Sequence, residues 1–248
     1  MGDCMENQFS RVDALLGSSN LEKLKNAKII VFGIGGVGGY VCEALARSGI
    51  YNFTLVDNDT VSITNINRQI IANMNTIGKD KVSIMKDRIL SINPLANVEI
   101  KKCFFLKENS NEFDFKSYDY IIDAVDTISA KIEIILKAKE SNVKVISALG
   151  AGNKINPSML EVTDIYKTSV DPLAKVLRKK LKEYRINKLK VVYSREKPLK
   201  PLYSLDSSDV VKKNIPASLV FVPAAMGLII AGEVIKDLTG IKNDKPGA

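Results

Sequence analysis

Four closely spaced glycines, Gly33, Gly35, Gly36 and Gly38, are the residues of this chain whose type and spacing most directly indicate chemistry. They follow an apolar run at 29–32 and precede an apolar-periodic stretch, so the order predicts a buried strand, a tight turn and a helix. Glycine lets the backbone turn sharply and lets an anion approach main-chain amides at the positive end of the helix dipole. We therefore expect the turn to bind a nucleotide phosphate.

A carboxylate follows at the spacing expected for ribose binding. Asp57 ends the run 53–57, about 20 residues after the glycines, where a strand-terminal acid commonly accepts hydrogen bonds from a ribose hydroxyl. These features together indicate a nucleotide, and NAD would be the usual interpretation.

Further charged residues favour ATP over NAD. Arg68 and Lys81 supply cations for additional phosphate charge, and Asp126, just beyond a predicted strand, offers a carboxylate to a magnesium ion. Attack on the α-phosphate of ATP develops charge that arginine, lysine and Mg²⁺ can neutralise, whereas a dehydrogenase has little need of clustered cations. The chain also has no histidine, the commonest proton donor in enzymes. An NAD-dependent oxidoreductase is therefore the disfavoured alternative.

Asp123 is interpreted as a structural strand-end residue.

Alternating strand and helix patterns position these residues at one edge of a sheet. The further predicted elements of this region are strands at 98–102, 118–123 and 143–147 and helices at 78–92 and 129–141. The alternation predicts an α/β fold with a Rossmann-like, doubly wound and mainly parallel sheet, in which ligands bind at the carboxyl ends of the strands. Strands at 159–165 and 190–194 are expected to belong to an added C-terminal region.

The 248 residues, of which 46% are hydrophobic, are enough for one large domain. We divide the chain into an N-terminal helical segment (1–27), an ATP-binding Rossmann-like domain (28–154) and a C-terminal extension of the same domain (155–248).

The N-terminal segment has the pattern of two short helices. Phe9, Val12, Leu15 and Leu16 share one apolar stripe, and Asn20 is the expected N-cap of a second helix that ends near position 27.

Positive charge is concentrated between positions 175 and 200, where eleven Lys and Arg face two acids, although the whole chain carries only +8. A helix beginning at Pro172 is expected to bury Leu173, Leu177, Leu181 and Tyr184 and to present the basic residues on the opposite face. Such a field is typical of a surface for a polyanion and favours nucleic acid, and an ordinary solvated helix face is the alternative. The candidate nucleic-acid contacts are Lys175, Arg178, Lys179, Lys182 and Arg185.

Residues 215–232 carry no charge, so they fit either a membrane span or a buried segment. Pro216, Pro223 and Glu233 favour the buried interpretation, with a strand at 219–222 and a helix from Pro223, and make membrane association the less favoured alternative. The polar stretch 204–214 before it is expected to be a mobile loop that could cover a nucleotide.

Cys4, Cys42 and Cys103 are scattered and form no CxxC pair, so neither a disulfide framework nor a cysteine zinc site is expected. Together with the lack of a basic-then-apolar leader, this favours a cytoplasmic location.

Five motifs occur in order between residues 33 and 126: GIGGVG, LVDNDTV, TNINRQ, GKDKV and DAVD. Together they resemble the ThiF/MoeB superfamily, whose adenylating domain is shared with ubiquitin-activating enzymes. The stretch SALGAGNKINPSMLEVTDIYKTSVDPLAKVLRKKL at 147–181 is similar to one branch, the tRNA threonylcarbamoyladenosine dehydratases.

The resemblance implies roles for individual residues. Asp57 would hold the ATP ribose, Asp59 and Asp126 would lie near Mg²⁺, and the nucleotide would also contact Asn65, Arg68, Gln69, Lys81 and Thr127. It implies a homodimer in which Arg11 reaches into the neighbouring active site and acts beside Arg68, Lys81 and Asp126. The alternative for Arg11 is an ordinary exposed arginine. It further implies a tRNA substrate and a cysteine desulfurase or sulfur-acceptor partner. The implied reaction is ATP-dependent cyclisation of threonylcarbamoyladenosine next to the anticodon, through adenylation of its carboxylate.

Two departures from the wider superfamily bear on the choice between activities. The paired CxxC motifs of many members are absent, and no cysteine lies in the later region where a thioester-forming residue would be expected. Both disfavour covalent sulfur or ubiquitin-like transfer. Activation of the C-terminal glycine of a sulfur-carrier protein remains the main alternative, and a non-catalytic nucleotide-binding adaptor that recruits tRNA or a sulfur-transfer partner is another.

Overall fold

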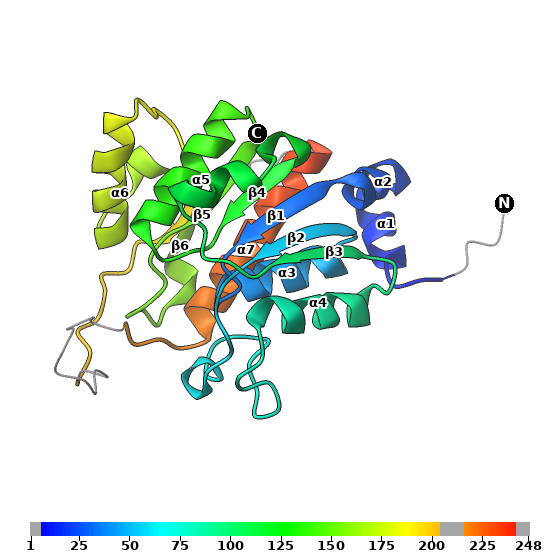
Figure 1. Cartoon of the computed structure of the whole chain (residues 1–248), viewed down its shortest axis with the longest axis horizontal. Coiled ribbons are helices and arrows are strands. Elements are labelled where there is room, and N and C mark those ends of the chain that lie inside the picture. Colours follow the sequence, from blue (N-terminus) through cyan, green and yellow to red (C-terminus); the bar gives the residue numbers. More distant parts are fainter. Residues whose placement is uncertain (1–5, 204–215, 242–248) are drawn as a thin grey trace.

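The core of the molecule is a sheet with helices on both faces. The computed structural model describes residues 6–203 and 216–241, and within them seven strands form one sheet in the order β3-β2-β1-β4-β5-β7-β6. Neighbouring strands are parallel, except that β6 and β7 are antiparallel. The predicted α/β fold, a doubly wound and mainly parallel sheet with added C-terminal strands, is confirmed (Figure 1).

The strands are β1 (Lys28–Phe32), β2 (Asn52–Val56), β3 (Asn97–Lys101), β4 (Tyr120–Asp123), β5 (Lys144–Ala148), β6 (Leu160–Asp164) and β7 (Lys190–Ser194). The α-helices are α1 (Ser10–Leu16), α2 (Ser18–Asn26), α3 (Gly38–Arg47), α4 (Lys81–Ile92), α5 (Ile128–Glu140), α6 (Pro172–Glu183) and α7 (Phe221–Thr239). Short 3₁₀ helices are η1 (Ile63–Asn65), η2 (Lys107–Glu112), η3 (Phe115–Ser117), η4 (Pro157–Met159) and η5 (Ile165–Lys167).

The first strand supplies the hydrophobic cores on both faces of the sheet. Successive side chains of a strand point to opposite faces, so Ile29 and Val31 pack with α3, α4 and α7, while Ile30 and Phe32 pack on the face covered by α5. All four residues are fully buried. A strand buried on both faces reads as an uninterrupted apolar run, which is why residues 29–32 could be assigned from sequence.

The strand order reverses direction at β1. This strand pairs with β2 on one side and β4 on the other, and the connecting helices α3 and α5 lie on opposite faces of the sheet. The loops that follow β1 and β4 therefore separate at the carboxyl edge of the sheet, the position at which doubly wound folds bind ligands.

The uncharged C-terminal segment forms α7, which packs against α3 inside the molecule. Val222, Met226, Ile230 and Val234 are buried, so the interpretation of this segment as core is confirmed. In residues 6–203 and 216–241, no helix is long and apolar enough to cross a membrane. The strand predicted at 219–222 is wrong, because α7 begins at Phe221 and Pro223 lies in its first turn, where proline is tolerated.

Other local predictions also need correction. The second helix begins at Ser18, and the Asn20 side chain donates back to the Leu16 carbonyl at 2.8 Å instead of capping the helix. Leu15, predicted to lie on an apolar stripe, is 82% exposed, and the seven-residue α1 buries none of its residues. Tyr184, predicted to be buried by the basic helix, lies just past the end of α6 and is 49% exposed. The predicted loop at 204–214 lies outside the described residues.

The amino-terminal edge of the sheet is tied to α7 by a polar cluster. Lys190, the first residue of β7, lies 2.8 Å from the Asp237 carboxylate and 3.2 Å from that of Glu233, and the Tyr120 hydroxyl donates to Asp237 at 2.6 Å. Burial opposes ionisation of Asp237, but hydrogen bonds from Lys190 and Tyr120 outweigh it and hold the pKa of this carboxyl below its ordinary value. We infer that the strands of 155–248 and α7 extend one domain, because they join the same sheet and the same core.

Two glycines of α7 have different surroundings and should respond differently to alanine. A Cβ at Gly227 would lie 2.5 Å from the Val37 carbonyl oxygen, whereas one at Gly232 would meet no described atom within 4 Å. Gly227→Ala should lower the free energy of unfolding by about 1–3 kcal/mol because α7 must move away from α3. Gly232→Ala should raise it by about 0.5–1 kcal/mol through the higher helix propensity of alanine. Guanidinium unfolding followed by circular dichroism measures both, and equal effects would contradict the close packing of the helices.

Candidate active site

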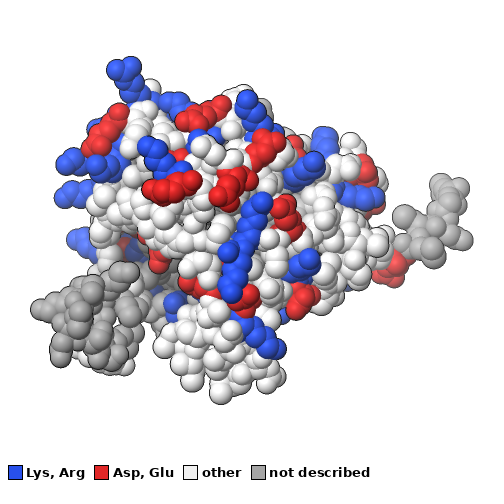
Figure 2. Space-filling view, viewed as in Figure 1, with Lys and Arg blue, Asp and Glu red and all other residues white. Residues whose placement is uncertain are grey.

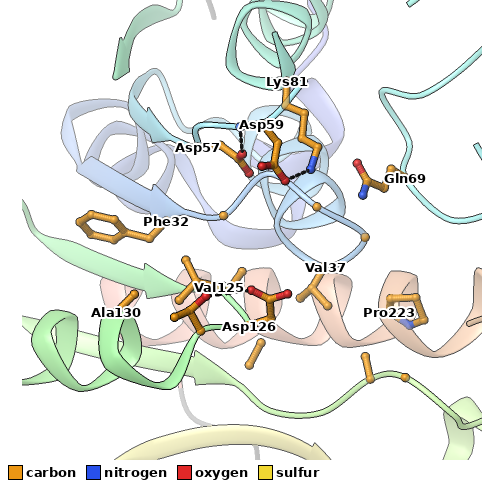
Figure 3. A pocket seen from close by; sticks show the side chains of 18 of the residues that line it. Phe32, Val37, Asp57, Asp59, Gln69, Lys81, Val125, Asp126, Ala130 and Pro223 are labelled. Atoms are coloured by element: carbon orange, nitrogen blue, oxygen red, sulfur yellow. Dashed lines mark hydrogen bonds and ion pairs between the residues drawn. The ribbon is translucent and has the colours of Figure 1, made fainter. Parts of the chain in front are cut away.

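A cavity of about 900 Å³ opens at the carboxyl edge of the sheet, between the loops that follow β1, β2, β4 and β5. Figure 3 shows Asp57, Asp59 and Lys81 on one side of the glycine turn and Asp126 on the other. Most of the predicted site residues line this cavity: Gly33, Gly35, Gly36, Asp57, Asp59, Asn65, Arg68, Gln69, Lys81, Asp126 and Thr127.

The glycines of the turn are required for two different reasons. Gly33 has a φ of +89°, and a Cβ on it would lie 2.7 Å from the Ala124 carbonyl oxygen. A Cβ on Gly38, which does not line the cavity, would lie 1.8 Å from the Gly33 oxygen. At Gly35 the nearest atom would be the Gln69 Nε2 at 3.9 Å, so the described chain leaves room for a side chain there. Gly35 is therefore free for the approach of a ligand at the N-terminus of α3.

Asp57 is held at the end of β2 by two main-chain amides. Its Oδ2 accepts from Ile34 N at 2.6 Å and its Oδ1 accepts from Asp59 N at 2.8 Å. Burial raises the pKa of Asp57, and the nearby Lys81 charge opposes that rise. Because each carboxylate oxygen can accept more than one hydrogen bond, the group can still accept from ligand hydroxyls.

Lys81 begins α4 and reaches back to the loop after β2. The residue is 5% exposed, its ammonium lies 2.7 Å from the Asp59 carboxylate, and its backbone amide donates to the Asp59 carbonyl. Asp59, predicted near a metal, thus forms an ion pair with the cation predicted to bind phosphate. Since Asp59 is exposed, a phosphate entering the cavity could share the Lys81 ammonium.

Arg68 and Gln69 lie side by side in the turn after η1. Arg68 Nη1 donates to the Thr64 carbonyl at 2.9 Å and to Asn67 Oδ1 at 3.0 Å, and in residues 6–203 and 216–241 it forms no ion pair. Burial lowers the pKa of Arg68. Gln69 is buried, and its Oε1 has no hydrogen-bond partner in the described chain. A half-buried cation and an unpaired acceptor would both gain from a polar anionic ligand.

The Asn65 side chain stabilises the same turn, because its Oδ1 accepts a hydrogen bond from Ser62 N at 3.1 Å. Asn65 is itself buried, so the turn that presents Arg68 and Gln69 has an internal polar support.

The loop carrying Asp126 and Thr127 is anchored by a fully buried ion pair. Lys131 in α5 lies 3.0 Å from the Asp123 carboxylate and also donates to the Ala148 carbonyl at 2.7 Å. Asp123 in turn accepts from Val125 N at 3.3 Å, so the interpretation of Asp123 as a structural residue is confirmed. Asp126 remains accessible from the cavity, with Thr127 Oγ1 3.4 Å from its Oδ1.

Magnesium bound with a nucleotide commonly uses one or two protein carboxylates, substrate phosphates and waters. The described residues contain no group of three or more His, Cys, Asp or Glu side chains that could hold a metal by themselves. The carboxylate of Asp126 in the cavity fits the sparser arrangement.

One predicted catalytic residue lies far from this cavity. Arg11 is exposed on α1. Phe9, just before this helix, has its ring centroid 5.7 Å from that of Tyr51, which immediately precedes β2. The parallel strands start at the amino-terminal edge of the sheet, whereas the cavity lies at the carboxyl edge. Arg11 therefore does not reach the cavity of its own chain.

The basic residues of α6 begin beside the cavity. Leu173, in the first turn of this helix, lines it, and Lys175, Lys179 and Lys182 follow as exposed residues. Figure 2 shows Lys and Arg side chains gathered over α6 at the left of the molecule. Arg185, just past the helix, is exposed as well. Arg178 differs from the other candidates, because its guanidinium donates to the Thr168 carbonyl at 3.1 Å and to the Thr168 hydroxyl.

Sequence reasoning missed one wall of the cavity, formed by residues 149–152 after β5 and by Ser218 and Pro223. The signal that could have identified it is the pair Gly150 and Gly152 directly after a predicted strand.

Comparison with known proteins identifies relatives along nearly the whole chain. Residues 9–247 match the ThiF family. A Bacillus subtilis tRNA threonylcarbamoyladenosine dehydratase is 42% identical over 242 residues, which cover 94% of this chain and 95% of that protein. The Escherichia coli protein of the same name is 38% identical over 182 residues, covering 73% and 68% of the two chains.

Solved structures agree with these sequences. The crystal structure of the E. coli dehydratase, TcdA, in complex with ATP superposes with a TM-score of 0.86 at 32% identity and covers 94% of both chains. Its complex with AMP gives a TM-score of 0.85 at 33% identity with the same coverage.

The two kinds of glycine in the turn generate a prediction for nucleotide binding. Gly35→Ala should fold with an unchanged melting temperature but bind ATP at least about tenfold more weakly, because the new methyl group occupies the space of the ligand. Gly38→Ala should instead lower the melting temperature, since its Cβ cannot fit against Gly33. Calorimetric titration with ATP and thermal unfolding separate the effects. Unaltered ATP affinity of folded Gly35→Ala would contradict the assignment.

Proposed function

The chain belongs to the ThiF family, and we propose that it is an ATP-dependent enzyme that dehydrates threonylcarbamoyladenosine next to the anticodon of tRNA. Relatives with this named activity align along 73% to 94% of the chain, and the similar E. coli enzyme has structures with ATP and AMP. The observation that carries the proposal is a cavity that combines the glycine turn, Asp57, Arg68 and Lys81 and adjoins the start of α6.

The first step forms an acyl-adenylate. A carboxylate oxygen of the threonyl group attacks the α-phosphorus of ATP, the bond from that phosphorus to the bridging oxygen breaks, and pyrophosphate leaves. Asp57 holds the ribose, while Arg68 and Lys81 offset the negative charge that develops on the phosphate oxygens. Main-chain amides at Gly35 and Gly36 add to this stabilisation at the N-terminus of α3.

The second step closes the ring. The carbamoyl group of the same nucleoside attacks the activated carbonyl, the bond from that carbon to the AMP oxygen breaks, and the carbamoyl group loses a proton. The tRNA has then lost one water, and ATP has become AMP and pyrophosphate. Adenylation is needed because a free carboxylate oxygen is a poor leaving group, whereas AMP is a good one.

Magnesium would be held by Asp126, with Asp59 close to the same phosphates, and it would supply further charge neutralisation at the α-phosphate. Asn65, Gln69 and Thr127 complete the nucleotide site in this proposal, with the Gln69 Oε1 gaining the partner that it lacks in the described chain.

The tRNA backbone would lie along the exposed cations of α6, and the use of tRNA and ATP favours a cytoplasmic location. Arg178 is the least suited of the five predicted contacts, because it is bound to Thr168. A cysteine desulfurase or sulfur-acceptor partner stays a prediction.

A homodimer would bring Arg11 of a second copy to the cavity. The segment 61–78 has Arg68 as its only charge and exposes Ile63, Met74 and Ile77. Leu219, just before α7, and Phe221, its first residue, are also exposed. This nearly uncharged face is the pale lower part of Figure 2 and lies next to the cavity, because Asn67 donates to the Ser218 carbonyl at 2.8 Å. A face of this kind suits a second copy of the chain.

Pyrophosphate release from Mg-ATP should depend on the modified nucleoside. With tRNA carrying threonylcarbamoyladenosine the enzyme should release pyrophosphate, and mass spectrometry should find the nucleoside lighter by one water. The same tRNA without the modification should give neither result. If only a carrier protein ending in glycine stimulates release, the proposed substrate is wrong and the carrier-activating alternative takes its place.

Mixing two inactive variants tests the exchange of Arg11 between copies. Arg11→Ala and Asp126→Asn should each be inactive alone, because one lacks the transferred arginine and the other a carboxylate of the cavity. Subunit exchange at equal concentrations should restore about a quarter of wild-type activity, since half of the dimers would contain one intact site. A mixture that stays inactive while native mass spectrometry detects the heterodimer would contradict the shared site.

A further inference from the structure

Lys154 is a buried lysine that the chemistry described above does not use. It is 2% exposed, and its ammonium donates to the Gly150 carbonyl at 2.5 Å and lies 3.2 Å from the Asp171 carboxylate. Gly150 belongs to the wall of the cavity that follows β5. Lys154 therefore bonds to a carbonyl within its own loop and links this loop to another segment of the chain, the one that carries Asp171.

That second segment is the start of the basic helix. Asp171 is the N-cap of α6, where its Oδ1 accepts from Ala174 N at 2.9 Å while its Oδ2 faces Lys154. Gly150 also fits closely here, because a Cβ on it would lie 3.1 Å from Asp171 Oδ2. One carboxylate thus connects the first turn of α6 to a wall of the cavity through Lys154.

Apolar packing supports the same connection. Leu149, the residue before Gly150, is buried in one hydrophobic cluster with Leu177 and Leu181 of α6. This packing is not directional, whereas the bonds of Lys154 to a carbonyl and a carboxylate fix one relative position of loop and helix.

We propose that Lys154 is a positioning residue that fixes the position of α6 relative to the cavity in which ATP would react. A polyanion bound to this helix is then held with its carboxylate at the α-phosphate of ATP. The inference rests on the proposed function for the identity of that polyanion, tRNA. The exposed cations of α6 determine the affinity for the RNA. Lys154 determines whether the reacting carboxylate of the bound RNA is correctly placed relative to ATP.

The two roles predict different kinetic changes. In Lys179→Glu/Lys182→Glu, which keeps the buried pair, the KM for tRNA should rise, with a shallower salt dependence and little change in kcat. Lys154→Met keeps the surface cations but loses the anchor, so KM should change little while kcat at saturating tRNA falls about 10- to 100-fold. ATP affinity, measured by calorimetry without tRNA, should be unchanged in both.

A charge-balanced variant separates positioning from stability. Lys154→Met leaves the Asp171 charge buried and unpaired, which destabilises the fold. Lys154→Met/Asp171→Asn removes both charges, and the amide oxygen of the new side chain can still accept from Ala174 N, so its melting temperature should recover toward that of the wild type. Its kcat should stay low, because the Gly150 carbonyl remains without its anchor. Amide hydrogen exchange should be faster at residues 149–153 in both variants.

Lys190→Met is the matched control, since it removes a half-buried ion pair at the opposite edge of the sheet. It should lower the melting temperature without changing kcat or KM. Recovery of kcat together with stability in the double variant would overturn the positioning role, as would faster exchange at 149–153 with normal turnover. If the wild type is inactive with modified tRNA, the proposed function itself has failed, whereas an active wild type with a normal kcat in Lys154→Met rejects only the role of Lys154.

Discussion

β1 lies between β2 and β4, and the helices that leave these neighbouring strands cover opposite faces of the sheet. Because of this reversal, the loops after β1 and β4 diverge at the carboxyl edge and leave a space that no side chain of the core fills. Every group assigned to the nucleotide chemistry within one chain lies at that edge: main-chain amides after β1, carboxylates after β2 and β4, and a lysine that begins α4. Lys131 then fixes the shape of the opening by joining the ends of β4 and β5 from within the protein.

Much of the nucleotide site could be predicted because its signals are local. A glycine turn between an apolar run and a helix needs no knowledge of the rest of the chain, and Asp57 follows at a characteristic spacing. What sequence could not separate is the reason for each glycine, since Gly38 is required by contact with Gly33 and Gly35 is not required by any described neighbour. Such a difference depends on distances between backbone atoms, which spacing alone does not give.

The errors and omissions concern residues whose behaviour depends on distant partners. Residues 219–222 are apolar and short, a pattern that strand and buried helix share, and only contact with α3 decides for the helix. Lys131 and Lys154 are buried, although lysine is nearly always exposed, because carboxylates from other elements neutralise them. Arg178 belongs to a basic run by sequence, but Thr168 engages its guanidinium. No periodicity in the sequence marks these pairings, so they could be identified only in the folded structure.

The packing of α7 on α3 also has a consequence for how this protein is made. Helix α3 ends at Arg47, whereas α7 begins at Phe221, so the two partners lie far apart in the order of synthesis. Until the ribosome has produced α7, the apolar side of α3 that includes Val41 has no helix to cover it. A nascent chain with this surface exposed is prone to aggregate, and chaperones bind such chains. We therefore expect α7 to cover α3, and so to complete this part of the core, only late in synthesis.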